Sequence, residues 1–179
     1  LLRWAGSKRT LVPQLALALR NAGDVRRYIE PFAGSACLFF ATRPRRAVLG
    51  DLNVELVDTY RTIRDHPRLV ARRMHGWATD EETYYKVRAS VPSTLGEVER
   101  AARFLYLNRL CFNGIYRTNR DGAFNVPFGS NPGALPREEH IYRCSVALRD
   151  AELRPGDFDL TTPDVGVGDF VYLDPPYTD

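Results

Sequence analysis

The sequence between Tyr28 and Asp51 alternates between strand-like and helix-like stretches in an order that few folds accommodate. Tyr28-Ile-Glu30 predicts a short strand, and the small residues after Pro31 predict a turn that leads into an apolar helix. Ala47-Val-Leu-Gly-Asp51 predicts a second buried strand, which ends on a carboxylate. Strand, glycine turn, helix and strand in this order are typical of a βαβ unit, so we expect an α/β fold.

A second constraint comes from the strand-like run Asp169-Phe-Val-Tyr-Leu-Asp174. Pro175 and Pro176 follow it, and two consecutive prolines fix the chain direction and remove two amide donors. In open α/β sheets, ligands bind beyond the carboxyl ends of the strands, near the point where the strand order reverses. We therefore expect Asp51 and Asp174 to flank one crevice at that edge.

The rest of the chain predicts helices around a loop-rich middle. Helical patterns are expected at residues 10–21, 54–64, 67–110 and 137–150. Asn, Gly, Arg, Asp and Pro predominate between Asn113 and Gly133, which is typical of a loop or hairpin. A further short strand is predicted at Ala151-Glu-Leu-Arg154.

Composition narrows the class of protein. No apolar run approaches the roughly 18 residues of a membrane helix, so no membrane partner is expected. Cys37, Cys111 and Cys144 are odd in number and far apart, which argues against a disulfide framework and favours a reducing cytoplasm. Neither the cysteines nor the three histidines show metal-ligand spacing, so no metal is expected.

The net charge of +3 is too small by itself to identify a nucleic-acid partner. Residues 100–120 hold five arginines and no acid, a pattern that alone is more often a solvated face than a DNA surface. Lys8 and Lys86 are the only lysines among 25 basic residues. A compact ammonium at Lys8 indicates a local steric or hydrogen-bonding demand, with chance as the alternative.

Taken singly, several of these residues have simpler interpretations. Asp51 alone is more often a helix N-cap than a ligand-binding acid, and Asn53 shares that capability. The turn after Pro31 fits a plain connection as well as a ligand loop. Trp4 alone is most often a core residue or part of a loose terminus.

Six motifs, in their order and spacing, resemble the Dam-type N6-adenine DNA methyltransferases over the whole chain. They are Trp4-Ala-Gly-Ser-Lys8, Pro31-Phe-Ala-Gly34, Gly50-Asp51-Leu-Asn53, Phe112-Asn-Gly-Ile-Tyr-Arg117, Phe124-Asn-Val-Pro-Phe-Gly129 and Asp174-Pro-Pro-Tyr177. The last motif is the least specific, because similar forms occur in enzymes that methylate guanine N2 in ribosomal RNA or a glutamine side chain.

The resemblance implies a Rossmann-like, S-adenosylmethionine-dependent methyltransferase sheet of mixed type with an inserted helical target-recognition domain. The catalytic and cofactor-binding part is expected at residues 1–55 and 136–179, and the insertion at 56–135. The implied activity is methyl transfer from S-adenosylmethionine to N6 of a flipped adenine in double-stranded DNA, with GATC as the target by analogy. Such a protein would be encoded by a bacterium, archaeon or phage and be DNA-associated in the cytoplasm, with a restriction endonuclease as a candidate partner.

The family's cofactor residues correspond here to Trp4, Lys8, Phe32, Gly34, Asp51, Asp157 and Asp174. Phe32 and Gly34 would form the loop along which the backbone approaches the methionine moiety. Asp51 would accept the ribose hydroxyls, because a carboxylate is a bidentate acceptor. The resemblance implies that Lys8 binds the methionine carboxylate and that Asp157 accepts a hydrogen bond from the adenine amino group.

The implied catalytic residues are Asp174, Pro175, Pro176 and Tyr177. Asp174 and the Pro175 carbonyl would accept the two N6–H bonds, and Tyr177 would stack on the flipped base. No metal takes part in this chemistry. The implied DNA-binding residues are Phe112, Asn113, Ile115, Arg117 and Pro127. Among them, Arg117 is the predicted guanine reader, since an arginine bidentate to guanine is the commonest specific major-groove contact.

Three departures from the family pattern are visible. Ala36 stands where the family usually has a second glycine in the loop, and Ser130 stands where some relatives have a basic residue. Family members also continue well past the Asp-Pro-Pro-Tyr motif, so we expect this chain to be a fragment. The alternative functions are therefore a catalytically inactive remnant that binds DNA or the cofactor, or a methyltransferase acting on RNA guanine or protein glutamine.

Overall fold

The computed structural model describes residues 1–4 and 6–175, and the chain divides into two compact units. The sheet unit comprises Gly6–Val57 and Ala147–Asp179, and the helical unit comprises Leu1–Ala5 and Asp58–Val146. The predicted catalytic part, residues 1–55 and 136–179, overlaps mostly with the sheet unit, and the predicted insertion, residues 56–135, overlaps mostly with the helical unit. The functional roles assigned to the two parts stay predictions.

Four parallel strands form the sheet in the order β3-β2-β1-β4. Their bounds are β1 Arg27–Glu30, β2 Ala47–Asp51, β3 Ala151–Pro155 and β4 Asp169–Val171. The predicted mixed sheet is wrong for these strands, since each connection crosses over and so favours parallel pairing. The chain steps from β1 outward to β3 and then returns to the other side of β1. The strand order therefore reverses between β1 and β4.

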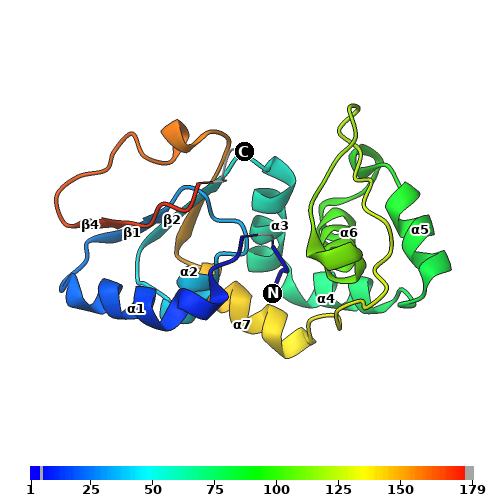
Figure 1. Cartoon of the computed structure of the whole chain (residues 1–179), viewed down its shortest axis with the longest axis horizontal. Coiled ribbons are helices and arrows are strands. Elements are labelled where there is room, and N and C mark those ends of the chain that lie inside the picture. The colour runs from blue at the N-terminus through cyan, green and yellow to red at the C-terminus, as the bar shows by residue number, and fades with distance from the viewer. Residues whose placement is uncertain (5, 176–179) are drawn as a thin grey trace. The chain divides into compact units, whose positions relative to one another are not determined.

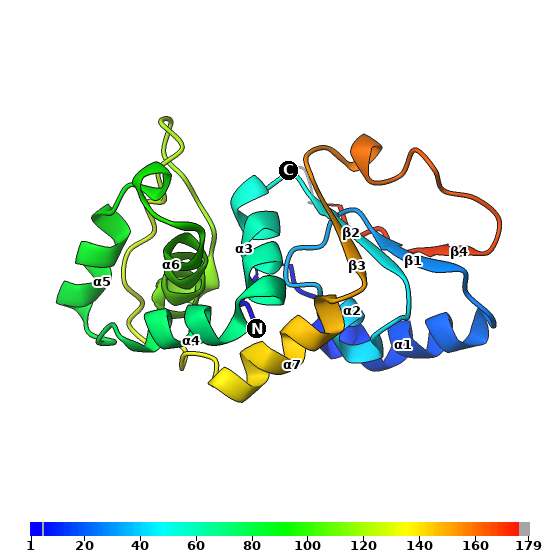
Figure 2. The same ribbon diagram turned by 180° about the vertical axis from the view of Figure 1, so that it is seen from behind.

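The sheet is covered on both sides (Figures 1 and 2). Helices α1 (Val12–Asn21) and α2 (Cys37–Thr42) lie on one side, and the connection from β3 to β4 lies on the other. The short 3-10 helix η1 (Arg9–Leu11) leads into α1, and η4 (Phe158–Leu160) lies in the connection. The inner strands β1 and β2 are buried along most of their length, as expected for parallel strands that are covered on both faces. The outer strand β3 alternates at its start between buried and exposed residues. Tyr28 of β1 is fully buried and stacks on Phe170 of β4, with ring centroids 6.1 Å apart.

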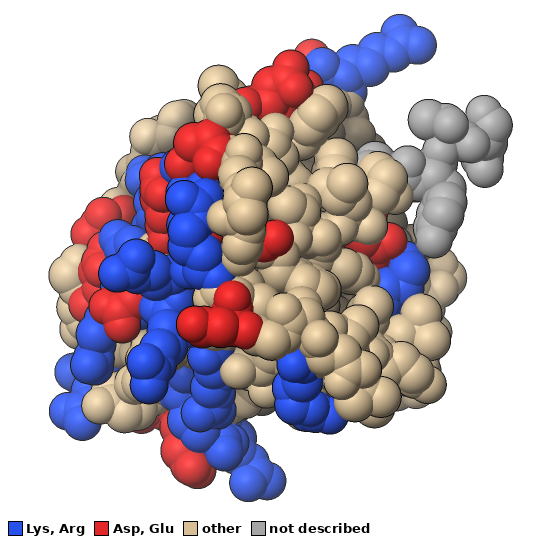
Figure 3. Space-filling model, turned by 90° about the vertical axis from the view of Figure 1, so that its left-hand side faces the viewer, with Lys and Arg blue, Asp and Glu red and all other residues tan. Residues whose placement is uncertain are grey.

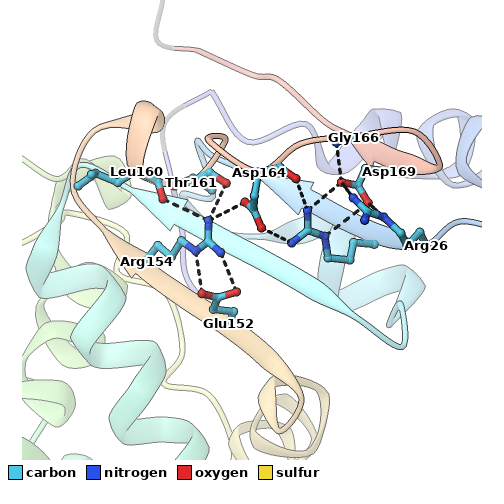
Figure 4. A network of polar contacts seen from close by, with 9 residues as sticks. Arg26, Glu152, Arg154, Leu160, Thr161, Asp164, Gly166 and Asp169 are labelled. Carbon is cyan, nitrogen blue, oxygen red and sulfur yellow. Dashed lines mark hydrogen bonds and ion pairs between the residues drawn. The ribbon is translucent and has the colours of Figure 1, made fainter.

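A chain of ion pairs holds the β3–β4 connection against the sheet (Figure 4). Arg154 of β3 pairs with Glu152 and Asp164 and donates to the carbonyl oxygens of Leu160 and Thr161. Arg27 of β1 then bridges Asp164 and Asp169, and Arg26 forms two hydrogen bonds to Asp169. These arginines hold the pKa of Asp164 down, to about 2, and lower that of Asp169 as well. Acidic and basic side chains lie beside one another on the face shown in Figure 3.

The connection also touches β2 at a glycine. A Cβ atom at Gly50 would lie 1.9 Å from Thr161 Oγ1, so no side chain fits there. Thr161 is fully buried at this contact. Gly50 therefore lets the connection pass close over the carboxyl end of β2.

The helical unit is built around a central helix, α6 (Glu97–Leu110). Its other elements are α4 (Pro67–His75), α5 (Glu81–Ala89), η2 (Pro92–Thr94) and η3 (Phe112–Gly114). Two helices, α3 (Val54–Asp65) and α7 (Glu138–Leu148), have residues in both units. Nine of the 14 residues of α6 are buried, which is typical of a helix that packs on all sides. Asp80 caps α5 by accepting a hydrogen bond from the Thr83 amide.

Three arginines of the Arg-rich stretch have structural partners. Arg103 is 3% exposed and donates to the carbonyl oxygens of Val87 and Arg88, at the end of α5. Arg100 donates to the Leu95 carbonyl and Arg109 to the Ala134 carbonyl. This part of the sequence is therefore largely an internal brace for backbone carbonyls.

No helix among residues 1–4 and 6–175 is both long and apolar enough to cross a membrane. Within the same residues, no group of three or more His, Cys, Asp or Glu side chains is arranged to hold a metal ion.

Candidate active site

The turn after β1 is a tight, left-handed segment. Gly34 and Ala36 both have φ of +46°, and Ala36 is the N-cap of α2. The Ala33 amide donates to the Gly50 carbonyl at 2.8 Å, which anchors the turn to β2. Ala36 thus adopts a backbone conformation that glycine takes without strain, although it carries a side chain.

Asp51, at the carboxyl end of β2, ties this turn to the start of α3. Its carboxylate accepts hydrogen bonds from the Gly34 amide at 2.8 Å and from the Asn53 amide at 2.9 Å. Burial raises the pKa of Asp51, while these two backbone donors oppose that shift. Asn53, rather than Asp51, caps the following helix, since its side chain accepts from the Leu56 amide at 3.0 Å.

Glu30, the last residue of β1, is a buried acid that the sequence analysis did not single out. It is 2% exposed and accepts a hydrogen bond from the Tyr28 hydroxyl at 2.8 Å. Burial raises the pKa of Glu30 to about 8, and the nearby charges of Asp174 and Asp51 add to that shift. The only signal in the sequence was an acid directly before Pro31, at the end of a predicted strand.

Lys8 and Asp174 form an ion pair at the same edge of the sheet. Lys8 Nζ lies 2.7 Å from Asp174 Oδ1 and donates to the Gly6 carbonyl at 2.9 Å. Both side chains are mostly covered, with exposed fractions of 22% and 23%. β4 ends at Val171, earlier than predicted, but the Tyr172 amide still donates to the Ile29 carbonyl and so directs the chain toward this edge. The Lys8 segment is fixed further by a 2.9 Å hydrogen bond between Ser7 and Ser35.

Asp157 follows β3 and lies near Asp51. The amide of the preceding residue, Gly156, donates to the Asp51 carbonyl at 2.9 Å. Asp157 is exposed, and its neighbour Phe158 packs against Phe32 with ring centroids 5.8 Å apart. The predicted residues Lys8, Phe32, Gly34, Asp51, Asp157 and Asp174 are all in the sheet unit, with Glu30 and Phe158 beside them. No separate signal in the sequence pointed to Phe158.

Trp4 has a different setting from the other predicted cofactor residues. It belongs to the helical unit, where its ring stacks on Tyr116 at 5.8 Å and on Phe104 at 6.4 Å. The adjacent Arg3 backbone exchanges two hydrogen bonds with the Asn108 side chain. Trp4 is therefore a partly buried member of an aromatic cluster, and its role toward a cofactor stays a prediction.

The five predicted DNA-binding residues lie on one segment of the helical unit. The chain turns back after η3, with antiparallel bridges between Cys111 and Phe128 and between Thr118 and Phe124. The Phe112 amide donates to the Pro127 carbonyl at 2.9 Å, which brings the two ends of the segment together. The tip of this hairpin extends past α5 and α6 in Figures 1 and 2.

The side chains of this hairpin are mostly accessible. Phe112, Asn113, Arg117 and Pro127 are exposed, and Ile115 is half-buried. Arg117 donates through Nε to the Asn125 side chain at 2.9 Å, which orients its guanidinium. Asn113 has φ of +54°, a backbone conformation that asparagine tolerates better than most residues.

Among the predicted catalytic residues, Asp174 and Pro175 are described, and Pro175 is exposed. Pro176 and Tyr177 lie outside the described residues. The roles assigned to these four residues stay predictions.

Known proteins resemble this chain along almost its whole length. The type II methyltransferase M1.LlaDCHI of Lactococcus lactis subsp. cremoris is 35% identical to it, covering 98% of this chain and 64% of that protein. The type II methyltransferase M.MjaIII of Methanocaldococcus jannaschii is 34% identical, with 98% of this chain and 68% of that protein covered. A DNA adenine methylase of Vibrio cholerae is 30% identical, with 98% and 64% covered.

The chain thus spans about two thirds of the length of these relatives. A family profile described as D12 class N6 adenine-specific DNA methyltransferase matches residues 4–179. With the Rossmann-like sheet and its strand-end acids, this match shows that the chain belongs to the D12 class N6 adenine-specific DNA methyltransferase family.

Proposed function

We propose that this protein transfers a methyl group from S-adenosylmethionine to adenine N6 in double-stranded DNA. The observation that carries the proposal is the position of Asp174 beside Lys8, beyond β4 where the strand order reverses. Ligands of open α/β sheets bind at such a switch point. Family membership and the names of the relatives support the same reaction and substrate.

The side chains at this edge suit the chemistry of S-adenosylmethionine. The cofactor carries a ribose diol, an adenine amino group, an ammonium, a carboxylate and a sulfonium that supplies the methyl group. Asp51 offers carboxylate oxygens for the diol, and Asp174 offers anionic oxygens for cationic groups. Glu30, whose raised pKa keeps it protonated near neutral pH, offers a neutral carboxyl group. Lys8 offers an ammonium for the carboxylate, and Phe32 with Phe158 offers an apolar surface for the adenine.

The protein's part in the reaction is to hold and orient the attacking nitrogen. The lone pair of adenine N6 is delocalised into the ring, so the amino group is a poor nucleophile. Asp174 and the Pro175 carbonyl would accept the two N6–H bonds and favour a pyramidal nitrogen. Alignment of that nitrogen with the methyl group supplies further acceleration. Tyr177 would stack on the base after it leaves the duplex.

Target recognition would belong to the hairpin of the helical unit. Arg117 is exposed and oriented by Asn125, as a side chain that reads guanine in the major groove requires. Phe112, Asn113, Ile115 and Pro127 would contact the duplex beside it. GATC is the proposed target by analogy with the Dam-type enzymes.

The test is transfer of labelled methyl from S-adenosylmethionine to an unmethylated GATC duplex, with the N6-methylated duplex as control. Label on the unmethylated duplex alone is expected. Asp174→Ala should abolish transfer, because one N6–H acceptor is lost, while DNA binding measured by fluorescence anisotropy stays largely intact. Transfer by this variant at the unaltered rate would contradict the role of Asp174.

The alternative functions give different results in the same assay. Label on RNA guanine or on a protein glutamine in place of DNA would favour a different substrate. Cofactor binding without transfer to any substrate would favour the inactive remnant. A randomised duplex library, sequenced for methylated adenine, would identify a target other than GATC. The DNA-associated, cytoplasmic location and the restriction endonuclease partner stay proposals that depend on this result.

A further inference from the structure

Lys8 is the only lysine of the sheet unit, and two carboxylates would bind its ammonium group. One is Asp174, whose Oδ1 atom lies 2.7 Å from Lys8 Nζ. The other is the carboxylate of the cofactor, which the proposed function assigns to the same ammonium. Binding of the cofactor would therefore disturb an existing ion pair.

The Lys8–Asp174 ion pair affects the predicted catalytic acid, Asp174, because other acidic side chains lie near it. Asp174 and Asp51 each lie close enough to Glu30 for their charges to raise its pKa. Lys8 compensates the charge of the one acid paired with it, Asp174. Its pair with Asp174 is only about one-fifth exposed, so solvent screens it less than a surface pair.

We propose that Lys8 is a positioning residue that exchanges partners, holding Asp174 in the cofactor-free protein and moving to the carboxylate of the bound cofactor. The inference rests on the proposed function, because it needs that cofactor. It implies that Asp174 becomes available to the adenine amino group only after the cofactor is bound. The cofactor-free protein would then hold a flipped adenine poorly.

The exchange can be tested by binding alone, in the 179-residue chain. The probes are S-adenosylhomocysteine and its decarboxylated analogue, which keeps the ammonium and lacks the carboxylate. Calorimetry gives the affinity of each for the unaltered protein, Asp174→Asn, Lys8→Met and the double variant. The measured quantity is the ratio of the two affinities, which isolates the contribution of the ligand carboxylate.

Partner exchange predicts opposite effects of the two single substitutions. In Asp174→Asn the ratio should rise about fivefold. Lys8 then binds the ligand carboxylate without first breaking an ion pair with a charged Asp174. In Lys8→Met the ratio should fall to about one, and the double variant should match it. An unchanged ratio in Asp174→Asn would mean that Lys8 serves both carboxylates at once, and would overturn the inference.

A control variant on the helical unit keeps the outcomes distinct. Lys86→Met removes a lysine paired with Glu82 on α5 and should leave the ratio unaltered. A changed ratio in that variant would assign the effect to net charge and count against exchange. Asp174→Asn decides the question by itself if Lys8→Met fails to fold in circular dichroism. Failure of the unaltered protein to bind either probe would overturn the proposed function together with the inference, whereas binding with an unchanged ratio overturns the inference alone.

Discussion

Arg43 ends α2 in a backbone conformation that arginine rarely adopts. Its φ of +48° lies in the left-handed region, where helices commonly end on glycine. We expect Arg43→Gly to raise the free energy of unfolding by about 0.5–1 kcal/mol, because relief of the Cβ strain exceeds the added flexibility of the unfolded chain. Urea denaturation measures the change. Arg45→Gly, two positions along the same exposed loop, lacks that strain and should instead destabilise the protein slightly.

Glu30 should make stability depend on pH. Burial raises its pKa from 4.5 to about 8, so between these values the folded protein retains a proton that the unfolded chain has lost. The free energy of unfolding should therefore fall as pH rises from about 4.5 to 8. Urea denaturation across this range should show a smaller fall in Glu30→Gln. Burial also raises the pKa of Asp51, so part of the pH dependence of stability should remain in Glu30→Gln.

The control for this pH dependence is Glu138→Gln, an exposed acid at the start of α7. It should retain the slope of the unaltered protein. Equal slopes in Glu30→Gln and the unaltered protein would contradict a buried, protonated Glu30.

At the scale of elements, α5 and α6 are joined by a buried cation. Arg103 of α6 donates to the last carbonyl oxygens of α5 and to the Ser90 hydroxyl. Arg103→Met should lower the free energy of unfolding by about 2–4 kcal/mol, because charge-assisted hydrogen bonds are lost and buried carbonyls stay unpaired. Arg100→Met removes one hydrogen bond at a half-buried site and should cost clearly less. Equal losses in urea denaturation would contradict the brace.

Local patterns predicted the elements better than their contacts. The βαβ unit, the strand at residues 151–154 and the main helices follow from short-range periodicity, and each is confirmed within a few residues. Glu30 and Arg103 were missed for a different reason. Their burial depends on segments far along the chain, which periodicity does not report. Asp51 and Asp174 were predicted to share one edge because parallel strands place their carboxyl ends together. The structure has Asp51 at the end of β2 and Asp174 just beyond β4, while their roles stay predictions.

At the scale of the whole molecule, the proposed cofactor and DNA functions fall mainly on separate units. We expect Arg117→Ala to reduce discrimination between the target duplex and a mismatched one by about 1–3 kcal/mol. Its affinity for S-adenosylhomocysteine should stay unchanged. Asp51→Asn should weaken that affinity and leave duplex discrimination intact. Fluorescence anisotropy with both duplexes measures the discrimination, and calorimetry with S-adenosylhomocysteine measures the affinity.

Arg120→Ala is the matched control on the same hairpin. Arg120 is exposed and is not among the predicted base-contacting residues. An arginine that contacts only phosphates weakens both duplexes equally when it is replaced and lowers the salt slope by about one, which is the result expected for this control. The same result for Arg117→Ala would contradict its role as a base reader.

The position of β4 beside β1 has a consequence for biosynthesis. Arg27 of β1 and its partner Asp169 of β4 are 142 positions apart. One edge of β1 therefore stays unpaired while the residues between them leave the ribosome. Pairings this distant in sequence form slowly, and exposed strand edges favour aggregation. A nascent chain stalled before residue 169 should therefore depend on chaperones, and one released after that point should not.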